Sequence, residues 1–416
     1  MNTVWIVNHY ASYPGDSATG SRHFSLARRL NELGWKPIII AASSEHNSDR
    51  QRLAEGVRRG TTTRDGVEFR WLRTSGYAGN GLDRILNMFQ FTAALVRRRS
   101  TEDLPRPDVV LGSTVHPLAA WAASRLAKRH GVPFIFEIRD LWPQTLIDMG
   151  KLRQNGIPAR LMRGLERYLC ERASSIITLL PHAGDYLETI GVDPRKVEWI
   201  SNGTDSGEFA TDPASQSDIF TFTYFGSLGN ANGIPAVLTA FEHAAKNTPE
   251  RESRLVIVGE GPLKEKLMQA ASSLEFGERI EFRPAVPKTE IPALAAQADC
   301  LVVNVLDLKL YRFGISLNKL FDYMAAARPI VIASNAANNP VRDADGGICV
   351  PADDAVAMGD GMAVVMRSSL QERARWGENA ARHVAKKYDY RVLGDQLDEL
   401  LSRQVNAQPM GLRSDG

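Results

Sequence analysis

The sequence predicts an α/β protein with two doubly wound domains, each a parallel sheet covered by helices on both faces. Two observations support this fold class. Short apolar runs such as "PDVVLGS" and "DCLVVNVL" alternate with helical segments in both halves of the chain, and this β-loop-α-β order is typical of parallel sheets. The length of 416 residues exceeds what one hydrophobic core usually holds, which favours more than one domain.

The first series of elements predicts an N-terminal domain at residues 1–205. A buried strand is expected at 4–7, followed by a loop rich in serine, glycine and proline and a helix over "SRHFSLARRLNELG" that ends at Gly34. Further strands are expected at "PIIIAAS", "PDVVLGS", "PFIFEIRD" and "SSIITLLP". Ligands of doubly wound sheets bind beyond the carboxyl ends of the strands, so binding residues are expected at these strand-to-loop junctions.

The second series predicts a C-terminal domain at residues 206–385, facing the first across a cleft. It follows the polar linker "DPASQSD" and has expected strands at "FTFTYFGSLG", "SRLVIVGEGP", "RIEFRPAV", "DCLVVNVL" and "PIVIAS". A helix over about 371–387 leads into a helical stretch that ends near Gln404. Residues 386–404 are expected to return to the N-terminal domain, and 405–416 to form a disordered tail.

Composition excludes several classes of protein. Hydrophobic residues make up 44% and charged residues 24%, with a net charge of +2, which is ordinary for a globular protein and sets nucleic-acid binding aside. The three widely spaced cysteines argue against a disulfide framework or a zinc cluster. No secretory signal and no apolar run of membrane-spanning length is apparent. A cytoplasmic location is expected, with peripheral contact on the inner face of the membrane left open.

The segment "FGISLNKLFDYMAAARPIV" places a lysine in the first turn of an expected helix. Ser316 is the expected N-cap, which makes Lys319 the third residue of that turn. The helix dipole makes this end electropositive, so a lysine there is unfavourable without a nearby anion. Two anions are candidates: the carboxylate of Asp322, three residues further on, and a phosphate bound at the helix start.

Several junctions together resemble the family 4 glycosyltransferases, which have the two-domain GT-B fold. "ISNGTD", "LVIVGEGPLKEKL", "NKLFDYMAAARPIV" and "GGICVPADD" are similar to the C-terminal half of that family in order and spacing. "RDLWP" and the opening "HYASYPGDSATGSRHFSLARRLNELGW" resemble a bacterial branch that builds surface polysaccharides such as O-antigen, capsule or exopolysaccharide. The resemblance covers most of the chain.

The resemblance implies a retaining transferase that needs no cofactor and no metal. Its donor is expected to be a nucleotide-diphosphate sugar, UDP- or GDP-linked with UDP favoured, and its acceptor an undecaprenyl-diphosphate-linked glycan. Two alternatives stay open: a nucleotide-sugar epimerase of the same architecture, and a non-catalytic nucleotide-sugar-binding partner of an assembly complex. Lys319 is expected to contribute to catalysis by stabilising the leaving diphosphate.

The resemblance also places the donor mainly on the C-terminal domain. A basic pair that many members carry is replaced here by Ser227-Leu228 and Asn232-Gly233, so Lys319, Arg312 and backbone N–H groups of 226–230 are expected to meet the phosphates. Asp322 stands where a ribose-binding glutamate is common, Gly314 stands near a second glutamate position, and the base is expected at 283–286. The predicted donor-binding residues are Gly20, Gly226, Ser227, Leu228, Gly229, Asn230, Arg283, Arg312, Ser316, Asn318, Lys319 and Asp322.

Charged residues follow the apolar run 133–136, where charge is costly unless it is paired or functional. Asp140 is a candidate base for the acceptor hydroxyl, and Arg139 a candidate for binding acceptor phosphate. The alternative is an Arg139–carboxylate pair, more expected for Glu137 than for Asp140. Ser113 stands about where many family members have a histidine facing the anomeric centre, which makes it an acceptor-side candidate. His116, three residues later, is a catalytic candidate or a capping residue.

The segment 82–99, "LDRILNMFQFTAALVRRR", combines apolar bulk with three arginines. Such a segment suits contact with an anionic membrane surface or a lipid-diphosphate acceptor. A core helix with a basic end is the alternative interpretation.

Overall fold

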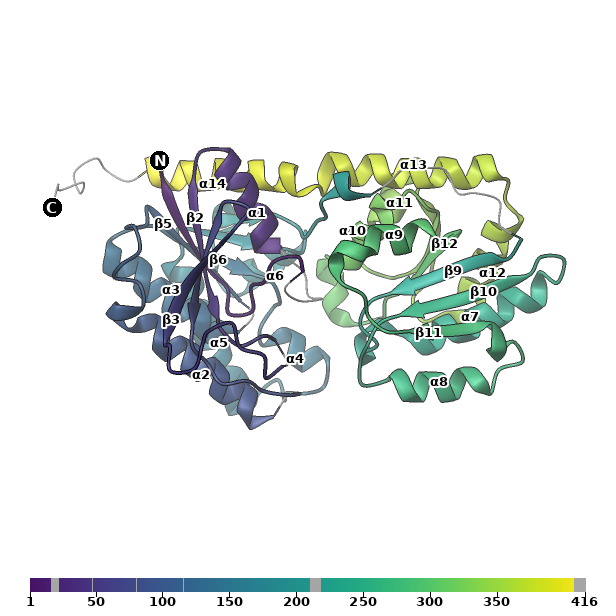
Figure 1. Ribbon diagram of the computed structural model, residues 1–416, viewed down its shortest axis with the longest axis horizontal. Coiled ribbons are helices and arrows are strands. Elements are labelled where there is room, and N and C mark those ends of the chain that lie inside the picture. Colours follow the sequence, from purple (N-terminus) through teal and green to yellow (C-terminus); the bar gives the residue numbers. More distant parts are fainter. Residues whose placement is uncertain (16–21, 47, 80, 115, 210–217, 408–416) are drawn as a thin grey trace. The chain divides into compact units, whose positions relative to one another are not determined.

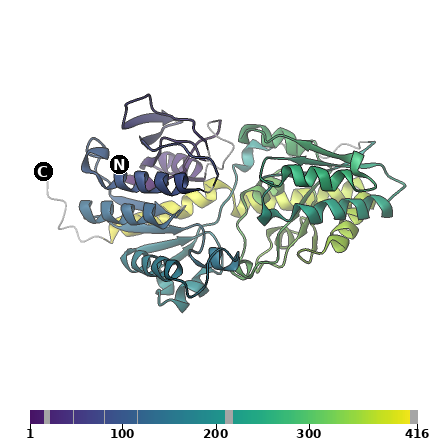
Figure 2. The same ribbon diagram turned by 90° about the horizontal axis from the view of Figure 1, so that it is seen from below.

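The computed structural model describes residues 1–15, 22–46, 48–79, 81–114, 116–209 and 218–407. These form two compact units (Figure 1). Unit 1 holds most residues up to Ser201 and the chain from Tyr390 onward, and unit 2 holds Asn202–Asp389. Each unit is built around its own sheet of mainly parallel strands with helices on both faces (Figures 1 and 2), which confirms the predicted fold class.

Unit 1 has a sheet in the order β3-β4-β2-β1-β5-β6-β7-β8 within the described residues. All neighbours pair in parallel except β3, which runs antiparallel to β4 at the edge. The sequence analysis missed β3, β4 and β8 of this sheet. The segment of β3, "RGTTTR", is polar and largely exposed and lacks the apolar alternation of a half-buried strand. The strands are β1 Thr3–Val7, β2 Lys36–Ala42, β3 Arg59–Arg64, β4 Val67–Leu72, β5 Val109–Ser113, β6 Phe134–Ile138, β7 Ser175–Thr178 and β8 Val197–Trp199.

The helices of unit 1 form two layers. One layer packs α1 against α14, the last helix of the described residues, which supplies Leu393, Leu397, Leu400 and Leu401 to the core (Figure 1). The other layer contains α2, α3 and α5, with α3 in contact with both neighbours. Of the predicted tail 405–416, α14 includes 405 and 406, and residues 408–416 lie outside the described part. The helices are α1 Arg22–Glu32, α2 Leu82–Val96, α3 Pro117–His130, α4 Gln144–Asp148, α5 Ile157–Arg172, α6 Ala183–Thr189 and α14 Tyr390–Asn406.

Unit 2 has an all-parallel sheet in the order β11-β10-β9-β12-β13-β14. Numbered within the unit, this is the 3-2-1-4-5-6 order of dinucleotide-binding folds, whose ligands bind where the order reverses. The reversal lies between β9 and β12, so a site is expected near the carboxyl end of β9. The strands are β9 Phe220–Phe225, β10 Ser253–Val258, β11 Ile280–Arg283, β12 Cys300–Asn304, β13 Ile330–Ala333 and β14 Gly347–Val350.

Alternate residues of the inner strands β10, β12 and β13 in unit 2 face two separate cores. On β12, Leu301 and Val303 pack toward the core shared with α9, α10 and α13, whereas Cys300 and Val302 pack toward the core shared with α7, α8 and α12. No helix among the described residues is long and apolar enough to cross a bilayer. The helices are α7 Ile234–Asn247, α8 Lys264–Ser272, α9 Ile291–Ala296, α10 Asn318–Ala325, α11 Pro340–Ala344, α12 Ala355–Arg367 and α13 Leu370–Lys387.

Candidate active site

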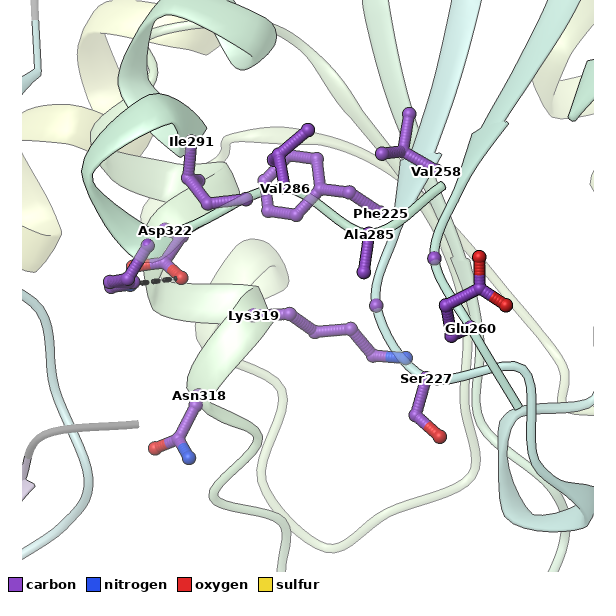
Figure 3. A pocket seen from close by; sticks show the side chains of 13 residues that line it. Phe225, Ser227, Val258, Glu260, Ala285, Val286, Ile291, Asn318, Lys319 and Asp322 are labelled. Atoms are coloured by element: carbon purple, nitrogen blue, oxygen red, sulfur yellow. Dashed lines mark hydrogen bonds and ion pairs between the residues drawn. The ribbon is translucent and has the colours of Figure 1, made fainter. Parts of the chain in front are cut away.

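Unit 2 contains a cavity of about 410 Å³ at the carboxyl ends of its strands. It lies where β9 and β10 end and where α10 begins, which is the region that the strand-to-loop junctions predicted (Figure 3). One end is largely apolar, and the other has glycines and polar groups. The lining residues are Phe225, Gly226, Ser227, Val258, Gly259, Glu260, Ala285, Val286, Lys288, Ile291, Asn318, Lys319 and Asp322.

Lys319 extends along the cavity from α10 toward Ser227 (Figure 3). Its Nζ donates hydrogen bonds to Tyr224 Oη at 2.7 Å and to Asn232 Oδ1 at 2.5 Å, and it lies 4.5 Å from the centre of the Tyr224 ring. An ammonium group has three N–H donors, so one donor is left for a ligand. Tyr224 Oη in turn donates to the carbonyl of Ser227 at 2.9 Å, which fixes the end of β9 beneath the lysine.

Gly226 makes room for this side chain. Its φ of 148° is one that residues with a Cβ rarely adopt. A Cβ there would also lie 3.1 Å from Cδ of Lys319 and 3.2 Å from Oη of Tyr224. The backbone of the strand end and the lysine can therefore both border the cavity only because residue 226 is a glycine.

The structure contradicts the local ion pair that was one explanation of Lys319. The carboxylate of Asp322 accepts from Lys288 Nζ at both oxygens, 2.5 Å each, and from Thr204 Oγ1 at 2.7 Å. The partners of Lys319 are neutral, and burial lowers its pKa to about 7. A partly buried lysine without a carboxylate partner at a helix N-terminus is well suited to meet an anionic ligand.

The predicted N-cap is wrong by one residue. α10 begins at Asn318 after an N-cap at Leu317 that offers no side-chain bond, so Lys319 is the second helical residue. The side chain of Ser316 accepts from the backbone N–H of Asn202 at 2.9 Å, and its carbonyl accepts from Asn202 Nδ2 at 2.7 Å. Ser316 thus holds the chain near Asn202 instead of capping the helix, and Asn318 lines the cavity.

Two of the backbone donors expected to meet the phosphates are already used. The N–H of Gly226 donates to the carbonyl of Val258 at 3.0 Å, and the N–H of Leu228 donates to the carbonyl of Glu260 at 2.9 Å. The side chain of Leu228 is fully buried in the core. Leu228 therefore contributes packing, whereas Ser227 is exposed and lines the cavity.

Several other predicted donor-side residues lie away from the lining. Gly229 precedes a 3₁₀ turn at Asn230–Asn232. The guanidinium of Arg283 pairs with Glu281 at 2.7 Å, and that of Arg312 is exposed and lies 4.5 Å from the Phe313 ring centre. The expected base-binding stretch 283–286 reaches the cavity through Ala285 and Val286. Gly20 lies outside the described residues.

In unit 1, Glu137 at the end of β6 belongs to a buried network. Its Oε1 accepts from Arg22 Nε at 3.0 Å, and its Oε2 is 2.7 Å from Nε2 of His23. Arg22 also donates to the carbonyls of Ile200 and Ser201. Burial alone would raise the pKa of Glu137, but His23 and Arg22 together hold that pKa well below its usual value. The expected Arg139–Glu137 pair is thus replaced by pairs to Arg22 and His23.

The other residues predicted in unit 1, Asp140, Arg139 and Ser113, lie at or just after the carboxyl ends of β6 and β5. Asp140 is exposed, and Arg139 is half-buried with its backbone N–H bonded to Thr114 Oγ1 at 3.0 Å. Ser113, the last residue of β5, is fully buried and its Oγ has no partner within the described residues. Only Asp140 and Arg139 of this set reach the surface.

His116 caps α3, which is one of the two roles that the sequence predicted for it. Its Nδ1 accepts from the backbone N–H of Ala119 at 3.3 Å, which caps α3, and its Nε2 lies 2.7 Å from Nδ1 of His9. Only 4% of its surface is exposed. Burial and, secondarily, the charge of Arg84 lower the pKa of His116 to about 3.

This burial predicts a loss of stability in acid. Between about pH 6.5 and pH 3 the unfolded chain binds a proton at residue 116 that the folded protein excludes. The free energy of unfolding should therefore fall as the pH decreases, by up to about 1.4 kcal/mol per pH unit from this one group. Urea denaturation at pH 7, 6 and 5 would measure the slope. His116→Asn, which keeps a capping oxygen, should flatten it, and an unchanged slope would contradict the assignment.

Sequence reasoning missed the partners that organise the cavity. Tyr224 reads as an ordinary core residue of an apolar strand, and Lys288 follows a proline in a polar stretch with no periodic signal. Thr204 lies in "ISNGTD", a motif that contributes to the family resemblance but does not indicate a contact with Asp322. Asn232 was noted only because a lysine is absent there.

The comparisons with known proteins agree with this architecture. Residues 19–203 match the model of the glycosyl transferase 4-like domain, and residues 219–368 match that of glycosyl transferases group 1. The chain is 25% identical over 290 residues to a probable glycosyltransferase, WbjE, of Pseudomonas aeruginosa, covering 67% of this chain and 70% of that protein. It is 26% identical over 313 residues to a GDP-mannose-dependent phosphatidylinositol monomannoside mannosyltransferase of Mycolicibacterium smegmatis. This match covers 70% of this chain and 74% of that protein.

Solved structures show the same fold. Sucrose-phosphate synthase of Thermosynechococcus elongatus superposes with a TM-score of 0.73 at 14% identity, covering 98% of this chain and all of that one. Anabaena Alr3699/HepE, solved in complex with UDP and glucose, superposes with a TM-score of 0.68 at 14% identity, covering 97% and 100%. The two matched domain models, together with this fold, identify a glycosyltransferase of the GT-B type. The chain belongs to the family 4 glycosyltransferases.

Proposed function

We propose that the protein transfers a sugar from a nucleotide-diphosphate sugar, with UDP as the favoured nucleotide, to a lipid-diphosphate-linked glycan of a surface polysaccharide, with retention of anomeric configuration. One observation carries the donor side of this proposal. Lys319, at the start of α10, borders a cavity of about 410 Å³ and has neutral partners among the described residues. The diphosphate of a donor supplies the anion that this lysine lacks.

The two ends of the cavity suit the two ends of a nucleotide. Phe225, Val286 and Ile291 give one end an apolar surface for a base, and Asp322 lies beside Ile291 at that end (Figure 3). Lys319 and Gly226 lie toward the other end, where a diphosphate would meet the N-terminus of α10. Cavities of a few hundred Å³ with few polar groups are typical of small-molecule sites. UDP in the HepE complex favours uridine, and the GDP-mannose in the name of the mycobacterial relative makes GDP the alternative to test.

The proposed reaction needs no protein nucleophile. The acceptor hydroxyl oxygen bonds to the anomeric carbon on the face that the diphosphate leaves, and the bond from that carbon to the phosphate oxygen breaks. Its electron pair leaves with the diphosphate, and a diphosphate oxygen takes the acceptor proton. Lys319 would stabilise the negative charge that grows on the leaving group, without a metal. Asp140 and Arg139 remain the predicted acceptor-side residues.

The direct test is acceptor-dependent release of the nucleoside diphosphate. UDP-, GDP- and ADP-sugars would be incubated with an undecaprenyl-diphosphate-linked sugar in the presence of a chelator, and the product anomer read by NMR coupling constants. Turnover with retained configuration supports the proposal. Donor hydrolysis or isomerisation without acceptor would favour the epimerase, and donor binding with no turnover would favour the non-catalytic partner.

The acceptor proposal includes contact with an anionic membrane through 82–99, and the exposure of α2 supports it. Leu82, Ile85, Leu86 and Phe89 are 82%, 48%, 53% and 56% exposed and recur at the spacing of one helical face. The opposite face is buried through Asn87, Phe91, Thr92 and Leu95. The helix is thus apolar on an exposed face as well as in the core, and an exposed apolar stripe of this kind marks an interaction surface.

Basic residues surround this stripe in the same helical layer. Eleven lysines and arginines but only three acidic residues lie in the segments 82–99, 117–130 and 157–172. In the whole chain the two kinds of charge are nearly balanced, with 50 lysines and arginines and 48 acidic residues. Arg125, Lys128 and Arg129 of α3, together with Trp121, line a surface hollow beside α2. On α5, Ile157 and Leu161 are 74% and 70% exposed. Apolar side chains interleaved with cations suit the headgroup region of an anionic bilayer.

We expect the protein to sediment with phosphatidylglycerol vesicles and not with phosphatidylcholine vesicles at low salt. The double substitution Leu86→Ser and Phe89→Ser should weaken binding at least about tenfold, because it removes most of the insertable apolar area. Val356→Ser, which changes a residue 56% exposed on α12 of unit 2, is the matched control. Equal binding to both vesicle types, or no effect of the double substitution, would contradict the membrane contact.

A further inference from the structure

The tip of Lys319 belongs to a closed ring of hydrogen bonds with three other residues. Its Nζ donates to Tyr224 Oη at 2.7 Å and to Asn232 Oδ1 at 2.5 Å. Tyr224 Oη and Asn232 Nδ2 in turn both donate to the carbonyl of Ser227, each at 2.9 Å. The ring thus ties the start of α10 to the end of β9 and to the turn 227–232. Lys319 alone has a task in the proposed reaction, and the other members of the ring are left without one.

The direction of Asn232 is fixed by the residue that follows it. Asn232 ends the 3₁₀ turn Asn230–Asn232, and Gly233 has a φ of 54°, in the left-handed region that favours glycine. A Cβ at residue 233 would lie 2.0 Å from Nδ2 of Asn304, which donates to the carbonyl of Gly233 at 3.3 Å. The turn is therefore held at its far end as well, and the side chain of Asn232 is left to meet Lys319.

The bonded partners of Lys319 in the described part of the chain are neutral, although two carboxylates line the same cavity. Glu260 pairs with Lys264 at 2.6 Å, and Asp322 pairs with Lys288 at 2.5 Å. Each carboxylate thus has a lysine of its own. The ring holds Lys319 without supplying the charge that would neutralise it.

A neutral holder matches what a diphosphate site requires of a lysine. The ammonium lies at the end of a flexible four-carbon stem, and a charged group stabilises a transition state best when it is already in place. Two acceptors restrict Nζ to one position and leave its third donor for a phosphate oxygen. Burial raises the pKa of Tyr224, so its hydroxyl stays neutral, and the amide of Asn232 does not titrate. An aspartate at position 232 would hold the ammonium too, but it would also compensate its charge.

We propose that Asn232 is a positioning residue of the donor site, which holds the Lys319 ammonium through a neutral amide so that the diphosphate remains as its counterion. This proposal rests on the nucleotide donor proposed above and adds a residue that acts through Lys319. It predicts that the neutrality of residue 232 matters as well as its hydrogen bonds. A residue that merely braces the turn through Ser227 would have the same effect in every variant that loses that bond.

Asn232→Asp and Asn232→Leu separate the two roles, because both lose the donor to Ser227 and only the first adds a charge. Calorimetric titration with UDP at pH 8, in buffers of different ionisation enthalpy, measures affinity and proton uptake together. The pKa of Lys319 is about 7 in the free protein, so the intact protein should take up a proton on binding. Asn232→Asp should take up almost none, because its carboxylate keeps Lys319 charged, and should bind UDP at least about tenfold more weakly.

Asn232→Leu should lose affinity and keep the proton uptake. Its affinity for UDP should fall about tenfold, because Lys319 loses one of the two partners that hold it, and the lysine still gains a proton when the diphosphate binds. Asn247→Asp makes the same chemical change as Asn232→Asp at an exposed position of α7 outside the cavity lining. This control should bind UDP like the intact protein.

Two results would overturn the role of Asn232. One is equal proton uptake in the intact protein and in Asn232→Asp, including no uptake in either, and the other is an unchanged affinity for UDP in Asn232→Leu. Residue 232 is half-buried in a surface turn, so both variants should fold, which circular dichroism would check. Failure of the intact protein to bind UDP, GDP and ADP would instead overturn the donor proposal itself.

Discussion

Replacing Lys319 by methionine is expected to lower the turnover number by about a hundredfold to a thousandfold, the loss typical when one group that stabilises transition-state charge is removed. Methionine keeps an apolar stem beside Gly226 and Tyr224 and removes the charge together with the hydrogen bonds to Tyr224 and Asn232. The variant should also lose most of its affinity for the nucleoside diphosphate. Steady-state kinetics and calorimetry measure the two effects. Lys266→Met, at an exposed position of α8 outside the cavity lining, is the control, and equal losses in both variants would refute the role of Lys319.

The lowered pKa of Lys319 gives the same prediction a pH signature. With a pKa of about 7 in the free protein, the lysine is charged below pH 7 and mostly neutral above pH 8. A bound diphosphate favours the charged form of Lys319 and so raises its pKa. Above pH 7 the protein therefore takes up a proton when it binds the diphosphate, and its affinity falls by up to about tenfold for each unit that the pH rises. Titrations at pH 8 in buffers of different ionisation enthalpy should detect uptake of up to one proton in the intact protein. Lys319→Met should show only the titration of the nucleotide.

The second large effect concerns stability. Glu137→Gln should reduce the free energy of unfolding of unit 1 by about 3 to 5 kcal/mol, because it leaves Arg22 buried without its carboxylate. Arg22 is 3% exposed and Glu137 1% exposed, so solvent cannot compensate. Six of the seven tryptophans lie in unit 1, the exception being Trp376, and urea denaturation followed by tryptophan fluorescence therefore reports mainly on this unit.

Asp193→Asn provides the comparison, because Asp193 forms a surface ion pair with Arg195, whose side chain is 89% exposed. Its denaturation midpoint should not change. A Glu137→Gln variant as stable as the parent would mean that the network does not stabilise unit 1.

The fold could be predicted because its signal is local. Buried parallel strands are short apolar runs that need no information about their neighbours, and ten or so of them alternate with helices along the chain. Lys319 could be found for a related reason: a cation in the first turn conflicts with the helix dipole, and that conflict is visible within one segment. The resemblance to a family then supplied the anion.

The partners of these residues could not be predicted, because they depend on contacts between distant segments. Lys288 and Asp322 are 34 positions apart and Thr204 and Asp322 are 118 apart, and nothing in either segment alone indicates the pair. The assignment of backbone donors failed at Leu228 for a similar reason, since its N–H bonds a carbonyl of the segment after β10. The alternative pairing of Lys319 with Asp322 came from helical spacing, which ignores the lysine that a separate turn brings in.

The position of α14 has a consequence for how the chain acquires its structure during synthesis. Leu393, Leu397, Leu400 and Leu401 complete the core that α1 begins, yet they follow α1 by more than 350 positions. At about 5 to 20 residues per second, the 188 residues of Asn202–Asp389 delay that completion by about 10 to 40 seconds after Ser201 is made. During this interval the side of α1 that packs on α14 lacks its native partner. Unit 2 can fold first, although it is encoded second, and a chaperone that shields α1 would act within this window.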